Sequence, residues 1–148
     1  MKLHLPFDSE IPEEHSRYGE ERSPKLDFSD IPREAEKLAL IMDDPDAPGG
    51  TFVHWVLWNI PVDGKVPGDL PSIQRLGESG AVHGTNDYGE IGYGGPKPPS
   101  GTHTYRFRAY ALDTELDLGP GAEASELESA MEGHIVDQTV RKADYSKP

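Results

Sequence analysis

The chain has 148 residues, no cysteine and a net charge of −13, from 27 acidic and 14 basic residues. This length fits a single domain, residues 1–148, with one core, and the missing cysteines exclude thiol catalysis, cysteine-bound zinc and disulfide switching. The charge disfavours nucleic acid as a partner, because no stripe of lysine and arginine offsets the repulsion from its phosphates.

Glycine and proline are frequent, with 16 and 14 residues, and follow no period. Because strong helical patterns are few, this composition favours an all-β domain with many turns. No run of about 18 apolar residues is present, and the N-terminal segment has no apolar signal core. We therefore expect a cytoplasmic protein with no stable membrane insertion.

The first third of the chain predicts one short and one long strand. The polar segment 13–22 is expected to be a surface connection, and Leu26 and Phe28 alternate with polar residues, as in a short half-buried strand. Residues 37–42 form a continuous apolar run that is too short for a typical helix. We predict that this run is a central strand covered on both faces.

Residues 43–50 form an acidic and rigid turn that contains Asp44, Asp46, two prolines and two glycines. The turn leads into a predicted strand over residues 51–60. Side chains alternate along a strand. The two expected faces of this strand are Phe52, His54, Val56, Trp58 and Ile60 on one side, and Val53, Trp55, Leu57 and Asn59 on the other.

Residues 62–101 predict a long ordered loop, with short strands near Val66 and near residues 81–82. Residues 102–112 then alternate most clearly of all. His103, Tyr105 and Phe107 share the predicted core face of this strand. Arg106 and Arg108 fall on the other face, which we expect to be solvated.

The C-terminal region predicts a helix over residues 126–142. Ser125 and Glu128 match a capping box, and Leu127, Met131 and Ile135 follow at helical spacing. Residues 144–148 are expected to be a tail.

Two strands thus bring histidines next to glycine- and proline-rich loops. If these strands meet at one edge, His54 and His103 could reach one pocket, with one carboxylate of the acidic turn orienting an imidazole. Residues 94–101 run directly into His103, and their glycine amides could form a nest for an anion.

Other chemistries have weaker support. Two histidines and two aspartates could ligate a metal, but no metal-binding spacing is present. A serine elbow and a P-loop are also absent. The remaining histidines are expected to lie on the surface or to be structural: His4, His15, His83 and His134.

Three ordered motifs resemble the signature of the phosphatidylethanolamine-binding protein family, also called the Raf kinase inhibitor protein family. They are Asp-Pro-Asp-Ala-Pro at residues 44–48, His-Trp-Val at residues 54–56, and the stretch from Gly94 to Tyr105. The match is to the short bacterial and archaeal branch, and it extends from about residue 11 through the predicted helix over residues 126–142. Thr104 departs from the pattern, because the family commonly has arginine there.

The resemblance implies a Greek-key β-sandwich of two antiparallel sheets with a small anion pocket at one end. Four residues match the family's pocket residues: Asp44, His54, His103 and Tyr105. Asp46 matches the second acid of the motif, residues 94–99, which include Gly94 and Pro98, would form the rim, and the Ala47–Pro48 bond is a candidate cis peptide.

The implied function is binding of a small anionic or phosphorylated ligand without catalysis, cofactor or metal. The ligand could sit on a partner protein, such as a kinase that the chain modulates or inhibits, and family analogy alone suggests a homodimer. Two alternatives stay open. One is a metal-assisted or general-base hydrolase that uses the same histidines and Asp44, and the other is an interaction protein with a vestigial pocket.

Overall fold

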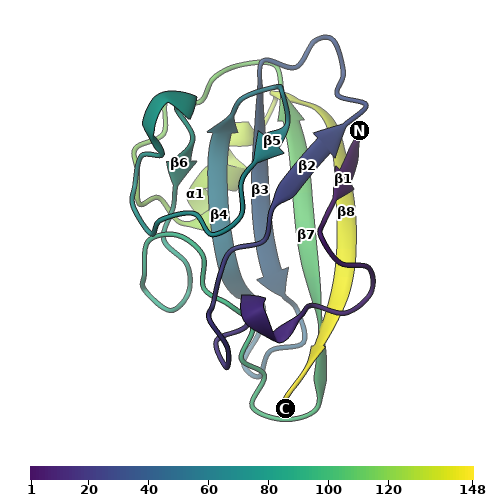
Figure 1. Cartoon of the computed structure of the whole chain (residues 1–148). Helices are drawn as coiled ribbons and strands as arrows, with labels where there is room; N and C mark the ends of the chain where they lie inside the picture. The colour runs from purple at the N-terminus through teal and green to yellow at the C-terminus, as the bar shows by residue number, and fades with distance from the viewer.

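The strands form two antiparallel sheets in a computed structural model that describes all residues, 1–148. The small sheet has the order β1 (Lys2–His4), β2 (Leu26–Ser29), β5 (Lys65–Val66). The large sheet has the order β6 (Val82–His83), β4 (Phe52–Ile60), β3 (Lys37–Asp44), β7 (Thr102–Leu112), β8 (Ile135–Ser146). In Figure 1 the small sheet lies in front of the large one, and helix α1 (Ala124–Met131) lies behind it. The predicted mainly β fold of two sheets with a C-terminal helix is confirmed.

The central strand β3 supplies both cores, which explains its continuous apolar run. Leu38, Leu40 and Met42 belong to the larger core cluster, which includes residues of the small sheet. Ala39 and Ile41 belong to a second cluster that includes buried residues of α1. β3 is therefore covered on both faces, as its sequence predicted.

Within the large sheet the chain follows a Greek-key order. β4 and β6 follow β3 on one side, and β7 returns to pair with the other side of β3. This return brings the beginning of β7 beside the end of β3, with Asp43 opposite Arg106. Two short 3₁₀ helices, η1 (Glu13–His15) and η2 (Gly77–Ser79), lie in the connections.

Strict alternation along β4 is wrong, because the strand contains two irregularities. Met42 pairs with Trp55 but Asp43 pairs with Val53, so His54 has no opposite residue on β3. A second register shift lies next to Asn59, whose φ is 54°. Residues 55–58 still alternate as predicted, but beyond the shifts Ile60 joins the core between the sheets and Val53 packs with the cluster on the α1 side.

The predicted helix over residues 126–142 is also wrong in its bounds. α1 ends at Met131, Gly133 has a φ of 80°, and β8 runs from Ile135 through most of the expected tail to Ser146. The capping box is formed by Glu123 and Glu126, two residues before the predicted pair. The reason is a long ladder with β7, which pairs residues 102–112 with residues 135–146 and outweighs local helix propensity.

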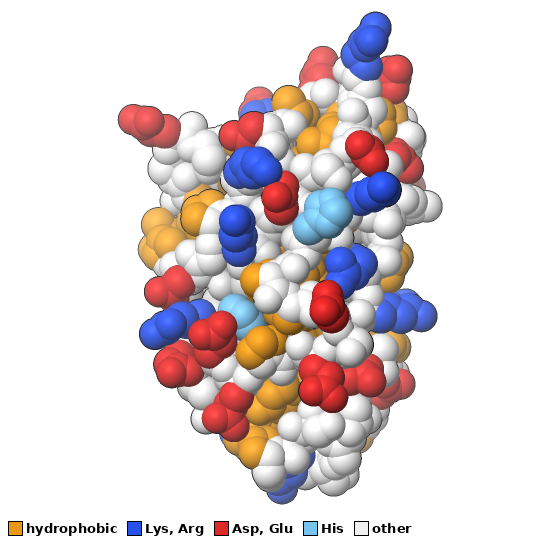
Figure 2. Space-filling view, turned by 45° about the vertical axis from the view of Figure 1, so that its right-hand side comes forward, with side chains coloured by type: hydrophobic (Ala, Val, Ile, Leu, Met, Phe, Trp, Pro, Cys, Tyr) orange, Lys and Arg blue, Asp and Glu red, His pale blue; other side chains and the backbone are white.

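The face of the molecule in Figure 2 carries lysine and arginine side chains interspersed with acidic ones, and no basic stripe crosses it.

The N-terminal amine also takes part in the fold, because it bonds to the Asp137 carboxylate at 2.6 Å. None of the helices is long and apolar enough to cross a membrane.

Candidate anion pocket

A pocket of about 300 Å³ opens at the end of the sandwich where β3 ends and where β4 and β7 begin. Four of the predicted side chains meet there: Asp44, His54, His103 and Tyr105. Pro98 lines the pocket as well, whereas Asp46 and Gly94 do not. The other lining residues are Ala47, Pro48, Phe52, Tyr88, Lys97 and Pro99.

Asp44 holds His103 in one orientation. It is the last residue of β3 and only 3% exposed, and its Oδ2 accepts a hydrogen bond from Nδ1 of His103 at 2.5 Å. Because a carboxylate can only accept, this bond fixes a ring proton on Nδ1. The second nitrogen, Nε2, makes no hydrogen bond within the protein and is free for a ligand.

Asp46 stabilises the acidic turn and does not enter the pocket. Its backbone N–H donates to Oδ1 of Asp44 at 2.9 Å, and its Oδ2 accepts from the Thr104 backbone N–H at 2.9 Å. The motif thus ties the turn to the beginning of β7. The Ala47–Pro48 peptide is trans, against the cis expectation; trans is the intrinsically preferred form of an X–Pro bond.

The His54 side chain is buried and is held by a hydrogen bond to the backbone of Gly94. Its Nδ1 donates to the Gly94 carbonyl at 2.7 Å, and the side chain follows the register shift in β4. Burial lowers the pKa of His54, although the Gly94 carbonyl and the charge of Asp44 oppose this shift. The lowered pKa favours the neutral ring, whose only proton is on the Nδ1 bonded to Gly94. Neutral His54 therefore has no N–H left for an anion, which departs from the expectation that both imidazoles donate.

Tyr105 lines the pocket, and its hydroxyl is buried. The residue has no exposed surface, and the hydroxyl has no hydrogen-bond partner in the protein. Burial, assisted by the charge of Asp44, raises the pKa of Tyr105 well above its usual value. The group therefore remains an O–H donor at any physiological pH.

The glycine-rich loop does not form the predicted nest of amides. The Gly94 N–H donates to the His54 carbonyl at 2.8 Å, and the Gly95 N–H donates to Oε2 of Glu21 at 3.1 Å. Prolines at positions 96, 98 and 99 have no N–H. The loop instead contributes apolar rings and the Lys97 side chain to the pocket wall.

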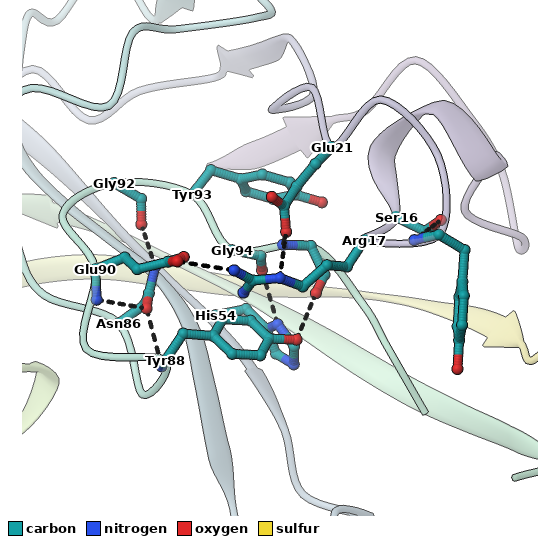
Figure 3. Close-up of polar contacts among 12 residues, drawn as sticks. Ser16, Arg17, Glu21, His54, Asn86, Tyr88, Glu90, Gly92, Tyr93 and Gly94 are labelled. Carbon is teal, nitrogen blue, oxygen red and sulfur yellow. Dashed lines mark hydrogen bonds and ion pairs between the residues drawn. The ribbon is translucent and has the colours of Figure 1, made fainter. Parts of the chain in front are cut away.

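An aromatic wall closes the other side of the pocket, and sequence reasoning did not identify it. The ring centroids of Phe52 and Tyr88 lie 4.7 Å apart, and the Tyr88 hydroxyl donates to the Gly95 carbonyl at 2.9 Å. The Arg17 guanidinium stacks 3.8 Å from the Tyr88 ring centroid and bonds to Glu90 at 2.8 Å. Figure 3 shows Arg17 beside the Tyr88 ring with its bonds to Glu21 and Glu90.

The polar segment 13–22 is more than the expected surface connection, because it forms a brace, defined here as the hydrogen bonds that tie it to residues 93–98 beside the pocket. The Arg17 N–H donates to the Pro96 carbonyl at 2.9 Å, and the Tyr18 hydroxyl donates to the Pro98 carbonyl at 2.9 Å. The Tyr93 hydroxyl donates back to the His15 carbonyl at 2.7 Å. These partners are about 80 residues apart in sequence, so no local pattern signals the contacts.

Arg106 and Arg108 do not form a solvated face. Asp43, which is 1% exposed, accepts two bonds from Arg106 at 2.8 and 2.9 Å, and Nη2 of Arg108 lies 3.0 Å from it. The bond with Asp43 raises the pKa of Arg106. This cluster lines a separate cavity with the beginning of α1, whereas the neighbouring Asp44 lines the anion pocket.

The remaining histidines make structural bonds elsewhere. His83 accepts from Nε1 of Trp55 at 3.1 Å and donates to the Ile73 carbonyl, and His134 pairs with Asp113 at 2.9 Å. His4 bonds to the Ser29 hydroxyl, and His15 bonds to the Arg22 carbonyl. No group of three or more histidine or acidic side chains is arranged to hold a metal ion.

Comparisons with known proteins agree on one family. The family model described as phosphatidylethanolamine-binding protein matches residues 5–146. A UPF0098 protein of Methanothermobacter thermautotrophicus is 50% identical over 138 residues, which cover 92% of this chain and 91% of the relative.

Two solved structures share the fold over nearly their whole length. A phosphatidylethanolamine-binding protein homolog from Chlamydia trachomatis has a TM-score of 0.87 and 37% identity, covering 99% of this chain and 97% of that one. Escherichia coli YbcL, described as a member of the mammalian family, has a TM-score of 0.86 and 26% identity, covering 99% and 98%.

Proposed function

This chain belongs to the phosphatidylethanolamine-binding protein family, in its bacterial and archaeal branch, and from that premise we propose that its pocket binds a small anion or a phosphoryl group. The observation that carries the proposal is the buried Tyr105 hydroxyl, which has no partner in the protein. A buried donor without a partner costs roughly 1–3 kcal/mol, and a bound oxyanion would recover it.

His103 and Asp44 supply the main charged groups of the proposed anion site. When the His103 ring carries a second proton, Nε2 offers an N–H and a positive charge to an anion, and the Asp44 carboxylate on Nδ1 balances that charge. Lys97 adds a further cation at the pocket wall. These local charges attract an anion although the chain as a whole carries a charge of −13.

The size of the pocket restricts the ligand. A volume of about 300 Å³ lies at the lower end of the range for small-molecule sites, which is roughly 300–1,000 Å³. It accommodates a phosphate with a small substituent, and it has no room for the acyl chains of a lipid. A phosphoryl group on a partner protein fits the same chemistry, and the chain then acts as a modulator of that partner, for instance a kinase.

Binding without catalysis is part of the proposal. The pocket contains no serine, threonine or cysteine side chain that could act as a nucleophile. A general-base hydrolase would need His103 and Asp44 to activate a water. We expect no turnover of p-nitrophenyl phosphate, and turnover that disappears in His103→Ala would contradict this part of the proposal.

Calorimetric titration with phosphate and phosphoethanolamine tests the binding. We expect the wild type to bind and His103→Ala to lose about tenfold or more in affinity, since a charged hydrogen bond is removed. His134→Ala is the matched control, because it removes a histidine from an exposed histidine–aspartate pair outside the pocket. Absence of binding to the wild type, or equal binding to His103→Ala, would reject the proposal.

A further inference from the structure

The orientation of His54 restricts the chemical form of the ligand. A carbonyl oxygen can only accept, so the bond to Gly94 at 2.7 Å fixes the proton of neutral His54 on Nδ1. Nε2 then keeps its lone pair and acts as a hydrogen-bond acceptor. No hydrogen bond within the protein uses Nε2, and His54 lines the pocket.

The surroundings of His54 favour the neutral ring. The side chain is enclosed by three aromatic rings, with centroids 4.9 Å away for Phe52, 5.7 Å for Tyr88 and 5.3 Å for Tyr105. Desolvation lowers the pKa of His54 more than the neighbouring acids raise it. The titratable and charged groups around the ring are Asp44 at the end of β3, Asp87 and Tyr88 in the loop after β6, Lys97 in the proline-rich loop, and His103 and Tyr105 on β7.

The pocket therefore combines one acceptor with donors. Nε2 of His54 accepts, the Tyr105 hydroxyl donates, and Nε2 of His103, on the side of the ring away from Asp44, donates when the ring carries a second proton. A fully ionised oxyanion has only acceptors, and it would place an oxygen lone pair against that of His54. An oxyanion that retains one O–H satisfies all three groups.

We propose that the pocket selects an anion that still carries an acidic proton, so that its ligand is the monoanion of phosphate or of a phosphomonoester. This inference rests on the proposed anion binding. The ligand O–H donates to His54, and the remaining oxygens accept from Tyr105 and His103. The pocket discriminates against oxyanions of the same shape and charge that have no O–H.

Methyl phosphate and methyl sulfate form a matched pair of probes. At about pH 5.5, below the second pKa of about 6 of a phosphomonoester, both are monoanions of similar shape, and they differ by one O–H. We expect calorimetry on the wild type to show methyl phosphate binding tighter by about tenfold or more, because methyl sulfate leaves a buried acceptor facing another acceptor. The ratio of affinities should fall towards one as the pH rises through about 6 and methyl phosphate loses its proton.

Two variants assign the discrimination to His54. Tyr105→Phe should weaken both anions and preserve their ratio, whereas His54→Gln should reduce the ratio, because its amide can also donate. Equal affinity of the wild type for the two anions would overturn this inference and leave the anion pocket standing. Failure of both anions to bind would overturn the proposed function itself. If His54→Gln does not fold, the ratio of the two anion affinities in the wild type, and its dependence on pH, still test the inference.

Discussion

At the scale of single residues, Tyr105 has a hydroxyl that the protein encloses without bonding to it. Tyr93 is a useful contrast, since its hydroxyl is also buried but donates to the His15 carbonyl at 2.7 Å. The first arrangement costs stability and makes a donor available to a ligand, and the second contributes stability. The two tyrosines therefore separate a ligand-binding role from a structural one.

Tyr105→Phe should leave the free energy of unfolding within about 0.5 kcal/mol of the wild type or raise it, because the lost hydroxyl has no partner. Its affinity for phosphate should fall about tenfold. Tyr93→Phe should instead lower the free energy of unfolding by roughly 1 kcal/mol or more and leave the affinity for phosphate unchanged. Denaturation and calorimetry on both variants test this, and a large stability loss in Tyr105→Phe would count against an unpartnered hydroxyl.

The adjacent residues Asp43 and Asp44 should also separate a structural role from a ligand-binding role. Asp43→Asn removes the partner of two arginines and should cost roughly 1–3 kcal/mol, less than for a fully buried pair because a third of the Arg106 side chain is exposed. Phosphate affinity should be nearly unchanged, since Asp43 does not line the anion pocket. Asp44→Asn should instead weaken phosphate binding about tenfold or more, because the charge behind His103 is lost. Equal effects of the two changes on binding would contradict this separation.

Buried histidines predict how stability depends on pH. Burial lowers the pKa of both His54 and His83 in the folded state. Above the ordinary histidine pKa of about 6.5 neither state binds the proton, and below it the unfolded chain binds protons that the folded chain does not. The free energy of unfolding should therefore fall as the pH drops from about 7 to 5, and urea denaturation measures it. The slope should decrease in His54→Gln, and a stability that rises over this window would contradict the buried neutral rings.

At the scale of elements, the limits of sequence reasoning follow from contacts between distant segments. β3 and β7 were predictable because an apolar run and an uninterrupted alternation each reflect local pattern. The faces of β4 were not predictable, because the register shift beside His54 exists only in the pairing with β3. The sequence of β8 predicts a helix because Leu127, Met131 and Ile135 continue a helical spacing, and the strand pairing with β7 overrides this spacing.

The proline-rich loop offers a test at this scale. A Cβ on Gly94 would lie 2.5 Å from Cδ2 of Tyr88, so Gly94→Ala must displace the aromatic wall or the carbonyl that holds His54. We expect a loss of roughly 1–3 kcal/mol in stability together with weaker phosphate binding. Gly119→Ala is the control, because a Cβ at residue 119 would meet no atom within 4 Å and the backbone there is not left-handed. Wild-type behaviour of Gly94→Ala would show that the loop is not packed as described.

At the scale of the whole molecule, the motifs sufficed to predict the family, the two-sheet fold and the meeting of Asp44, His54, His103 and Tyr105. Composition and motif could not predict the brace from residues 13–22, since Arg17 and Tyr88 share no pattern and meet only in the fold. They also could not give the proton position on His54, which depends on the Gly94 carbonyl. The structure therefore adds to the sequence the knowledge of which pocket groups donate a hydrogen bond and which accept one.

The net charge of −13 and the small pocket together predict weak contact with membranes. An anionic bilayer repels an acidic protein, and a pocket of about 300 Å³ cannot enclose a whole lipid. In sedimentation with vesicles of phosphatidylcholine and phosphatidylethanolamine, or of phosphatidylserine, the protein should stay in the supernatant even where free phosphoethanolamine binds. Retention on vesicles that phosphoethanolamine displaces would contradict this expectation.

The most direct test of the anion pocket is a crystal structure of the protein grown in phosphate. We expect a tetrahedral anion in the pocket, with one oxygen within roughly 2.5–3.0 Å of the Tyr105 hydroxyl and another within hydrogen-bond distance of Nε2 of His103. A pocket that holds only water at saturating phosphate, with the Tyr105 hydroxyl bonded to the protein, would contradict it.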